Sequence, residues 1–321
     1  MAVVVTALAR GDGGALARLW RDLWILHESW GGYPAAQSDR VYAALAQRID
    51  GWAEEAAGDP VRGAHVHLVA RDEDAAPLGQ IEGWLERYGE SSATPTTCEL
   101  RSLIVDARAR GRGVGTALVR ALEALAGRVV RGPSFFVAEV LVQNTAQAFY
   151  RGLGYRPIGQ HVMLPTTPTA SGAEAARVAT MMDAWTLARL ELLRRQQLQR
   201  RGDLRLDPPR ALDATFLAHV SRHLTRARDV VDLVTPTAAC ALSTSLLEPP
   251  FAPVVRAVLS RVSASSAGVA ALLEAALPMA AARGAPRLEV QDLPLGALDA
   301  AFTRRGAAAF SELWGKPAQP R

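Results

Sequence analysis

The 321-residue sequence has little cysteine and no long apolar run. Its two cysteines, Cys98 and Cys240, have neither the spacing of a zinc site nor that of a redox motif, so no disulfide framework and no metal site are expected. No apolar run reaches about 18 residues, which excludes a transmembrane helix, and the first residues lack the basic segment of a signal peptide. The sequence therefore predicts a reduced, cytoplasmic protein that does not bind a membrane.

Neither sign of charge dominates the sequence. There are 36 Lys and Arg residues against 32 Asp and Glu residues, a net charge of +4. The densest basic run, residues 194–205, lacks the interleaved aromatic residues that stack on bases, so no nucleic-acid partner is expected. The small excess of positive charge suits a protein that receives a polyanionic cofactor.

Hydrophobic periodicity predicts an α+β domain in the first half of the chain. The expected strands are Val3–Ala7, His65–Arg71, Leu78–Glu86, Glu99–Val105, Ser134–Asn144 and Ile158–Leu164, and the expected helices include Gly14–His27, Ser38–Ala56 and a segment that starts at Val114. A cluster of Pro, Thr, Ser and Gly over residues 166–176 predicts a linker between a domain of residues 1–165 and a second domain of residues 177–321.

The segment RARGRGVGTALVRAL, Arg108–Leu122, places three alternating glycines between a predicted strand and a predicted helix. The first N–H groups of a helix have no intrahelical partner and favour an anion such as phosphate. A P-loop would need a lysine after the glycines, and there is none. The dinucleotide fingerprint also fits poorly, because its third small position falls on Thr116 or Leu118.

A third motif fits this turn. Residues 110–115, RGRGVG, match R-x-x-G-x-G, which resembles the pyrophosphate-binding turn of the GCN5-related N-acetyltransferases, the GNAT superfamily. The segment QNTAQAFYRGLGY, Gln143–Tyr155, resembles the second signature of that family, with Gln143 at its Asn position and Asn144 one place off. The resemblance implies acetyl-CoA as co-substrate and a mixed twisted sheet around a βαβ core.

The resemblance also implies roles for residues around the turn. Tyr150 matches the family's general acid, whose phenol is protonated at neutral pH and can give its proton to the leaving thiolate. Glu99, four residues before Leu103, is the first candidate for the general base. The residues expected to bind acetyl-CoA are Leu103, Ile104, Val105, Arg110, Gly111, Arg112, Gly113, Val114, Gly115, Thr116, Gln143, Asn144 and Phe149.

The acceptor is expected to be a primary amine, most simply on a small molecule, with a protein amine still open. Glu28, Trp30, Tyr33 and Glu82 are the candidates for contacting it, and Glu82 and then Glu28 with His27 are the next candidates for the base. A non-catalytic acyl-CoA sensor or partner-binding module remains an alternative. A monomer and a homodimer are both compatible with the sequence.

The second half of the chain repeats the order of the first, which predicts a tandem arrangement. Expected helices at Glu174–Arg200 and Pro209–Thr225 precede strands at Val230–Val234 and Cys240–Leu246. An ungapped comparison places Gly268 on Gly113, and a strand at Arg287–Val290 and a helix at Leu295–Gly306 follow. In this alignment Ser265, Ala267 and Ala270 stand where the first copy has Arg110, Arg112 and Gly115. Further along, the second copy has Phe302-Thr303 where the first has Phe149-Tyr150. The second copy is therefore expected to keep the fold but to lack the phosphate-binding turn and the catalytic phenol.

Overall fold

The structure, a computed structural model, describes residues 3–56, 58–62, 64–87, 96–128, 135–166, 176–205, 217–218, 224, 230–247, 251–263, 266–295 and 300–318. The chain forms two compact units, and each takes residues from both halves of the sequence. The N-terminal unit contains Met1–Arg156, Glu248–Pro253 and Trp314–Arg321, and the C-terminal unit contains Pro157–Leu247 and Val254–Leu313. This division differs from a simple boundary near residue 165, because two short segments from the second half belong to the N-terminal unit.

The N-terminal unit is built on strands in the order β1-β3-β4-β5-β6, with β2 paired to β3. Its pairs are antiparallel except β5 with β6, which is parallel. The elements are β1 (Val4–Ala7), α1 (Gly13–Ser29), α2 (Asp39–Ala56), β2 (Val61–Arg62), β3 (His65–Arg71), β4 (Pro77–Arg87), β5 (Thr96–Val105), η1 (Ala107–Ala109), α3 (Val114–Ala126), β6 (Phe135–Leu141) and α4 (Gln147–Gly152).

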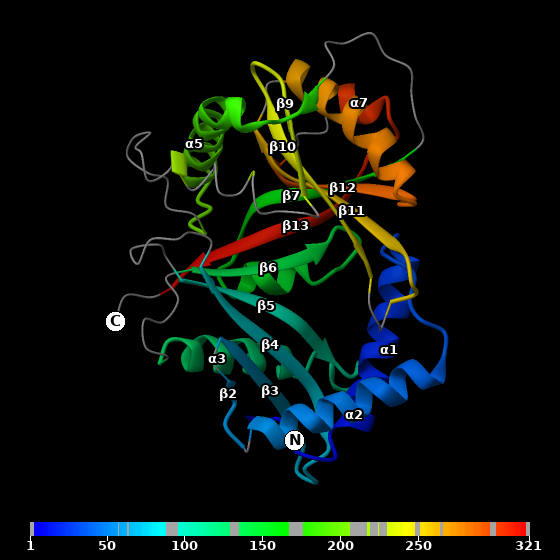
Figure 1. Ribbon diagram of the computed structural model, residues 1–321. Coiled ribbons are helices and arrows are strands. Elements are labelled where there is room, and N and C mark those ends of the chain that lie inside the picture. Colours follow the sequence, from blue (N-terminus) through cyan, green and yellow to red (C-terminus); the bar gives the residue numbers. More distant parts are fainter. Residues whose placement is uncertain are drawn as a thin grey trace. The chain divides into compact units, whose positions relative to one another are not determined.

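Helices cover both faces of this sheet (Figure 1). On one face α3 buries Leu118 and Leu122 against Ile81 of β4 and Ala138 of β6. On the other face α1 and α2 pack around Leu16 and Ile49, together with Val69 and Ile104 of the sheet. The alternation of apolar residues along each strand supplies both cores, since successive side chains point to opposite faces.

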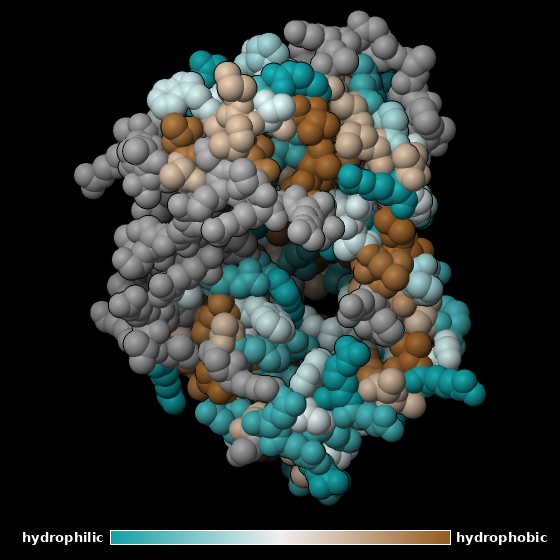
Figure 2. All heavy atoms as spheres, viewed as in Figure 1, coloured by the Kyte–Doolittle hydropathy of each residue, from teal (hydrophilic) through white to brown (hydrophobic). Residues whose placement is uncertain are grey.

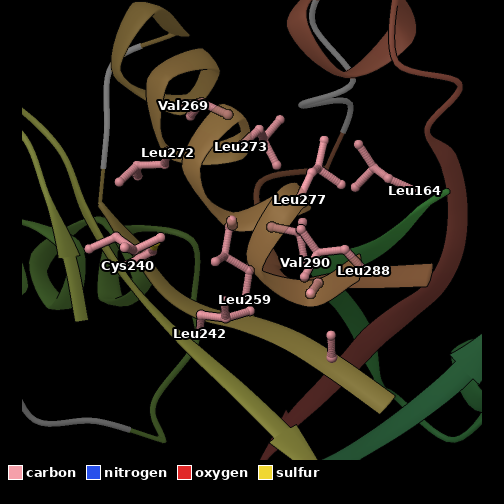
Figure 3. Packing of buried hydrophobic residues seen from close by; sticks show 14 of the residues in the cluster. Leu164, Cys240, Leu242, Leu259, Val269, Leu272, Leu273, Leu277, Leu288 and Val290 are labelled. Atoms are coloured by element: carbon pink, nitrogen blue, oxygen red, sulfur yellow. The ribbon is translucent and has the colours of Figure 1, made fainter. Parts of the chain in front are cut away.

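The C-terminal unit repeats this element order. Its strands lie in the order β7-β12-β11-β10-β9-β8, and β11 and β12 form the parallel pair. In its main core α7 places Leu272, Leu273 and Leu277 on the strands, against Leu242 and Leu288 (Figure 3). The elements are β7 (Arg156–Pro165), β8 (Arg177–Val178), η2 (Met181–Asp183), α5 (Ala184–Arg200), β9 (Val230–Val234), β10 (Ala239–Leu246), β11 (Val255–Ser263), α7 (Ser266–Ala282), β12 (Arg287–Leu293), α8 (Ala300–Thr303) and β13 (Ala308–Pro317).

The two units share one irregularity, and it confirms the repeat. Ser102 in β5 has φ 54° and Arg261 in β11 has φ 54°, and each lies where the register with the preceding antiparallel strand shifts. In both units the bulge comes after the last residue pair of the parallel ladder, Leu100↔Ala138 in one and Leu259↔Val290 in the other. A β-bulge bends its strand and changes the direction of the residues after it.

Several expectations for the second half need correction. The helix expected from Glu174 begins at Ala184, because a capping box between Thr180 and Asp183 starts the helical segment there, after β8. The helix expected at Leu295–Gly306 is only α8, Ala300–Thr303, and residues 296–299 lie outside the described part. Most of the expected linker and of the expected helix at Pro209–Thr225 also lies outside the described residues.

The ungapped alignment of the two copies is also wrong. Gly113 is the N-cap of α3, whereas Gly268 lies inside α7, because α7 begins at Ser266. Eight residues, 106–113, lie between the end of β5 and the start of α3, whereas β11 ends at Ser263 and α7 starts at Ser266, with residues 264 and 265 outside the described part. The second copy therefore lacks the length of the glycine turn as well as its arginines.

No helix among the described residues is long and apolar enough to cross a membrane. On the face drawn in Figure 2, hydrophobic residues lie in separate areas among hydrophilic ones.

Candidate active site

The strands β5 and β6 separate just before the glycine turn. Their parallel ladder runs from Thr97↔Phe135 to Leu100↔Ala138, while β5 continues to Val105 and stays paired with β4. The bulge at Ser102 lies at this point. The expected cofactor residues Leu103, Ile104 and Val105 therefore lie on the part of β5 that has left β6 and pairs with β4 alone in the printed ladders.

The glycine turn presents backbone N–H groups at the start of α3. Gly111 has φ 74° and Gly113 has φ 82°, a left-handed conformation that glycine adopts without strain. The first intrahelical donor is Ala117, which bonds to the carbonyl oxygen of Gly113, so the N–H groups of residues 114–116 precede the ladder of α3. A Cβ added at either left-handed glycine would meet no atom within 4 Å, so the space beside the turn is open.

The arginines of the turn have different surroundings. Arg108 is paired with Asp106, 2.7 Å away, and its hydrogen bonds lower the pKa of that carboxyl to about 2. Arg110 is exposed and donates from Nε to the carbonyl oxygen of Val105 at 3.1 Å, which fixes it beside the end of β5. Arg112 is exposed. The turn thus joins oriented N–H groups to two guanidinium groups, a combination that fits a pyrophosphate.

The second signature packs directly on this turn. A Cβ at Gly115 would lie 3.4 Å from the ring of Phe149, so the glycine allows α3 and α4 to approach closely. Tyr150 is buried beside Phe149 and Tyr155, with ring centroids 5.1 and 5.6 Å away. Burial raises the pKa of the Tyr150 phenol above its usual value, which keeps it protonated at neutral pH.

The two polar residues at the start of this signature differ in environment. Gln143 is exposed, whereas the Asn144 side-chain oxygen accepts a hydrogen bond from the backbone N–H of Ala146 at 2.9 Å. Asn144 therefore shapes the turn into α4 rather than facing outward, and the one-place offset between these residues has a structural reason.

The candidate bases lie on the sheet face that α1 and α2 cover. Glu99 is paired with Arg101 on the same strand, and its side chain is 18% exposed. Glu82 is 6% exposed and lies 3.2 Å from His65 Nε2. Burial alone would raise the pKa of the Glu82 carboxyl, but the hydrogen bond with His65 and the charge of His67 outweigh it and lower that pKa.

The remaining acceptor candidates lie near the end of α1. The Glu28 carboxylate accepts the backbone N–H of Ala35 at 3.1 Å, so it holds the loop after α1. The Trp30 ring lies 5.6 Å from that of His27, and the Tyr33 ring lies 6.3 Å from that of Phe251. Among the described residues there is no group of three His, Cys, Asp or Glu residues that could hold a metal ion.

Three features of this region were not predicted from the sequence. Arg101 pairs with the expected base, Glu139 is the exposed residue after the last ladder pair of β6, and Phe251 comes from the other half of the chain. Arg101 and Glu139 could have been found by following strand alternation. Phe251 gives no local signal, because its neighbours in the N-terminal unit are remote in sequence.

Comparison with known proteins adds the family. Residues 63–157, which span β3 to the start of β7, match a family model described as an acetyltransferase (GNAT) domain. The chain contains a GNAT acetyltransferase domain. This GNAT domain includes the splayed strands, the glycine turn and the Phe149-Tyr150 signature, and it places the protein among the acyltransferases.

Solved structures are similar over both units. A GCN5-related N-acetyltransferase from Sphaerobacter thermophilus is 17% identical with a TM-score of 0.58, covering 99% of this chain and 96% of that chain. A GCN5-related glucosamine N-acetyltransferase region of a fungal multi-domain GH3 β-N-acetylglucosaminidase is 15% identical with a TM-score of 0.60, covering 98% of this chain and 38% of that chain. At these identities the likeness concerns the fold. No curated protein sequence matches the chain.

Proposed function

We propose that the N-terminal unit binds acetyl-CoA at the glycine turn and transfers its acetyl group to a primary amine. The observation that supports this most is the junction of the two binding features. β5 leaves β6 after Leu100, and five residues later the chain enters a turn with two left-handed glycines and two exposed arginines. A splayed strand offers hydrogen bonds to an extended arm, and the turn offers them to its phosphates.

Bound acetyl-CoA would supply a thioester. This chain's residues would orient the thioester, donate one proton to the leaving sulfur and accept one from the attacking amine. Backbone N–H groups of the splayed segment 103–105 would stabilise negative charge on the thioester oxygen. The Tyr150 phenol would give its proton to the departing sulfur, and burial favours that protonated state. Glu99 would accept the proton of the attacking amine, directly or through water, while Arg101 holds its carboxylate in place.

The C-terminal unit is proposed to bind no acetyl-CoA. It retains the parallel pair and the bulge, but two residues replace the eight that connect β5 to α3. The proposal rests on this shorter spacing between the strand and the helix. The second half of the sequence also supplies Glu248–Pro253 and Trp314–Arg321 to the N-terminal unit, which is a structural contribution.

Calorimetric titration of the full chain with acetyl-CoA, followed by a thiol-release assay over a panel of amines, tests these proposals. We expect one site per chain and amine-dependent release of CoA. Two equivalent sites would contradict the assignment of the C-terminal unit. Tight binding without release for any amine would favour a sensor, and no binding would remove the glycine turn from the function.

A further inference from the structure

Six rings of the N-terminal unit lie together: five come from α1 and the loop after it, and Phe251 comes from the second half of the sequence. Trp24 lies 5.3 Å from Trp20, 5.2 Å from His27 and 4.4 Å from Phe251, measured between ring centroids. Trp30 and Tyr33 extend the group through His27 and Phe251. All six side chains are partly buried, neither sealed in the core nor fully exposed. These six residues form the aromatic cluster: Trp20, Trp24, His27, Trp30, Tyr33 and Phe251.

Phe251 is fixed in the cluster by its backbone. Phe251 forms an isolated antiparallel bridge with Ala35, and the next N–H, that of Ala252, donates to the carbonyl oxygen of Pro34 at 2.9 Å. The carboxylate of Glu28 holds the same loop through the N–H of Ala35. The loop after α1 is therefore tied on both sides, which gives its rings a defined surface.

Glu139 lies on the splayed strands, and its charge acts on His27 of the aromatic cluster. It comes directly after Ala138, the last residue of β6 that pairs with β5. Its neighbours Ala138 and Val140 point into the α3 core, so Glu139 points to the face that α1 covers, and its charge acts on His27. The carboxylate thus lies where β6 leaves β5, on the sheet face that α1 covers.

The charges around this opening favour a cation. Burial lowers the pKa of His27 to about 4, so the imidazole is neutral at pH 7 and does not repel an ammonium group. Glu139 and Glu28 supply negative charge, and the indole ring of Trp30 attracts cations and can pack against a flat apolar group.

From this arrangement we infer that the acceptor is a primary amine carried on an aromatic group. The ammonium would lie at Glu139, and the aromatic group would pack on the rings of Trp30 and Phe251. This inference rests on the proposed function and names the substrate class of the same site. It also assigns Phe251, from the second half of the sequence, as a residue that determines acceptor specificity.

A thiol-release assay with the full chain and acetyl-CoA tests the inference. Two aryl amines, 2-phenylethylamine and tryptamine, are compared as acceptors with ethylamine and glucosamine, which carry no aromatic ring. We expect kcat/KM for the aryl amines to be at least about tenfold higher, since a buried ring contributes a comparable free energy. Phe251→Ala and Glu139→Gln should each raise KM for 2-phenylethylamine about tenfold and change KM for acetyl-CoA less than about twofold. Trp185→Ala, which removes a ring that is 56% exposed in the C-terminal unit, is the matched control and should change neither KM.

Two results would overturn the inference while the proposed function stands: equal kcat/KM for ethylamine and the aryl amines, or an unchanged KM for 2-phenylethylamine in Phe251→Ala. If Phe251→Ala fails to fold, Phe251→Leu keeps most of the apolar volume without the ring and should still raise KM for the aryl amine. Failure of the proposed function has a different signature, because the wild-type chain would then neither bind acetyl-CoA in calorimetry nor release thiol with any amine.

Discussion

Lys316 Nζ lies 2.9 Å from both carboxylate oxygens of Glu123 on α3, although 193 residues separate them in the chain. The Tyr155 hydroxyl donates to the same carboxylate at 2.8 Å, and Lys316 lies 5.3 Å from the centroid of the Tyr155 ring. Two residues earlier Trp314 is 1% exposed in the core under α3. Trp314 and Lys316 are therefore part of the N-terminal unit.

Removing these contacts should destabilise the N-terminal unit. We expect Trp314→Ala to lower the free energy of unfolding by about 3–5 kcal/mol and Lys316→Met by about 1–3 kcal/mol, because one leaves a cavity and the other leaves a half-buried carboxylate without its cation. Urea unfolding monitored by circular dichroism measures both. Arg304→Met, at an exposed position of the C-terminal unit, is the control, and an equal loss there would argue against a specific role for Lys316.

Gly113→Asp should weaken acetyl-CoA binding by about two powers of ten or more, because its carboxylate would repel the pyrophosphate. Gly113→Asn is the matched control, since it has the same size and the same left-handed strain without the charge. Calorimetry should show a much smaller loss for Asn than for Asp. Similar losses in the two variants would mean that backbone conformation, not charge, governs binding at this turn.

Tyr150→Phe should lower kcat by about 10²-fold or more and leave KM for acetyl-CoA nearly unchanged, because the phenol acts on the leaving sulfur. Phenylalanine keeps the ring that packs on Phe149 and Tyr155. Tyr155→Phe is the contrast: it loses the bond to Glu123 and should change stability rather than kcat. A drop of less than about twofold for Tyr150→Phe, with chemistry rate-limiting, would assign the proton to another donor.

Glu99→Gln and Glu82→Gln should separate the candidate bases. Loss of the base lowers kcat and removes the acidic limb of the pH–rate profile, which we expect for Glu99→Gln. Glu82→Gln breaks a buried hydrogen bond with His65 and should lower stability while the pH profile stays in place. The reverse pattern would transfer the role of the base to Glu82.

The protein should lose stability in acid through His27. Its pKa falls by burial from 6.5 to about 4, so between these values the unfolded chain binds a proton that the native state does not. The contribution of His27 to the free energy of unfolding is therefore complete above pH 6.5. It falls by about 3 kcal/mol as the pH drops to 4. His27→Gln should flatten that fall in urea unfolding series at pH 7 and pH 4.5. If the free energy of unfolding falls equally with pH in the variant and the wild type, His27 does not cause the loss of stability in acid.

Local patterns predicted most of the N-terminal unit. β3, Leu118 and Leu122 of α3, and the glycine turn were readable because periodicity and a short motif carry the information within a few residues. The β-bulge at Ser102 was not predicted, because nothing in its neighbours marks the positive φ. β13 was missed too, although the repeat offered a signal: a strand comes after α4 in the first copy, so one should come after α8 in the second.

The site was predicted less completely than the fold. The sequence spacing of four residues from Leu103 indicated Glu99. Its pairing with Arg101 was not predicted, because it requires that both side chains point to the same face of the strand. Phe251 contacts Trp24 across more than half of the sequence. No short segment of sequence predicts that two such distant residues meet, because the contact closes a very long loop. Sequence patterns found the cofactor turn, whereas the acceptor surface required the tertiary structure.

The positions of Trp314 and Lys316 have a consequence for synthesis. A ribosome delivers the glycine turn and the Phe149-Tyr150 signature long before it delivers the last residues of the chain, because synthesis proceeds from the N-terminus at about 5–20 residues per second. Trp314 fills the core of the first-made unit and Lys316 neutralises Glu123 there, so the core of that unit stays incomplete until residues 314 and 316 have been made. A nascent chain stalled before Leu313 would expose apolar surface beneath α3, and we expect chaperone binding to be strongest at that stage.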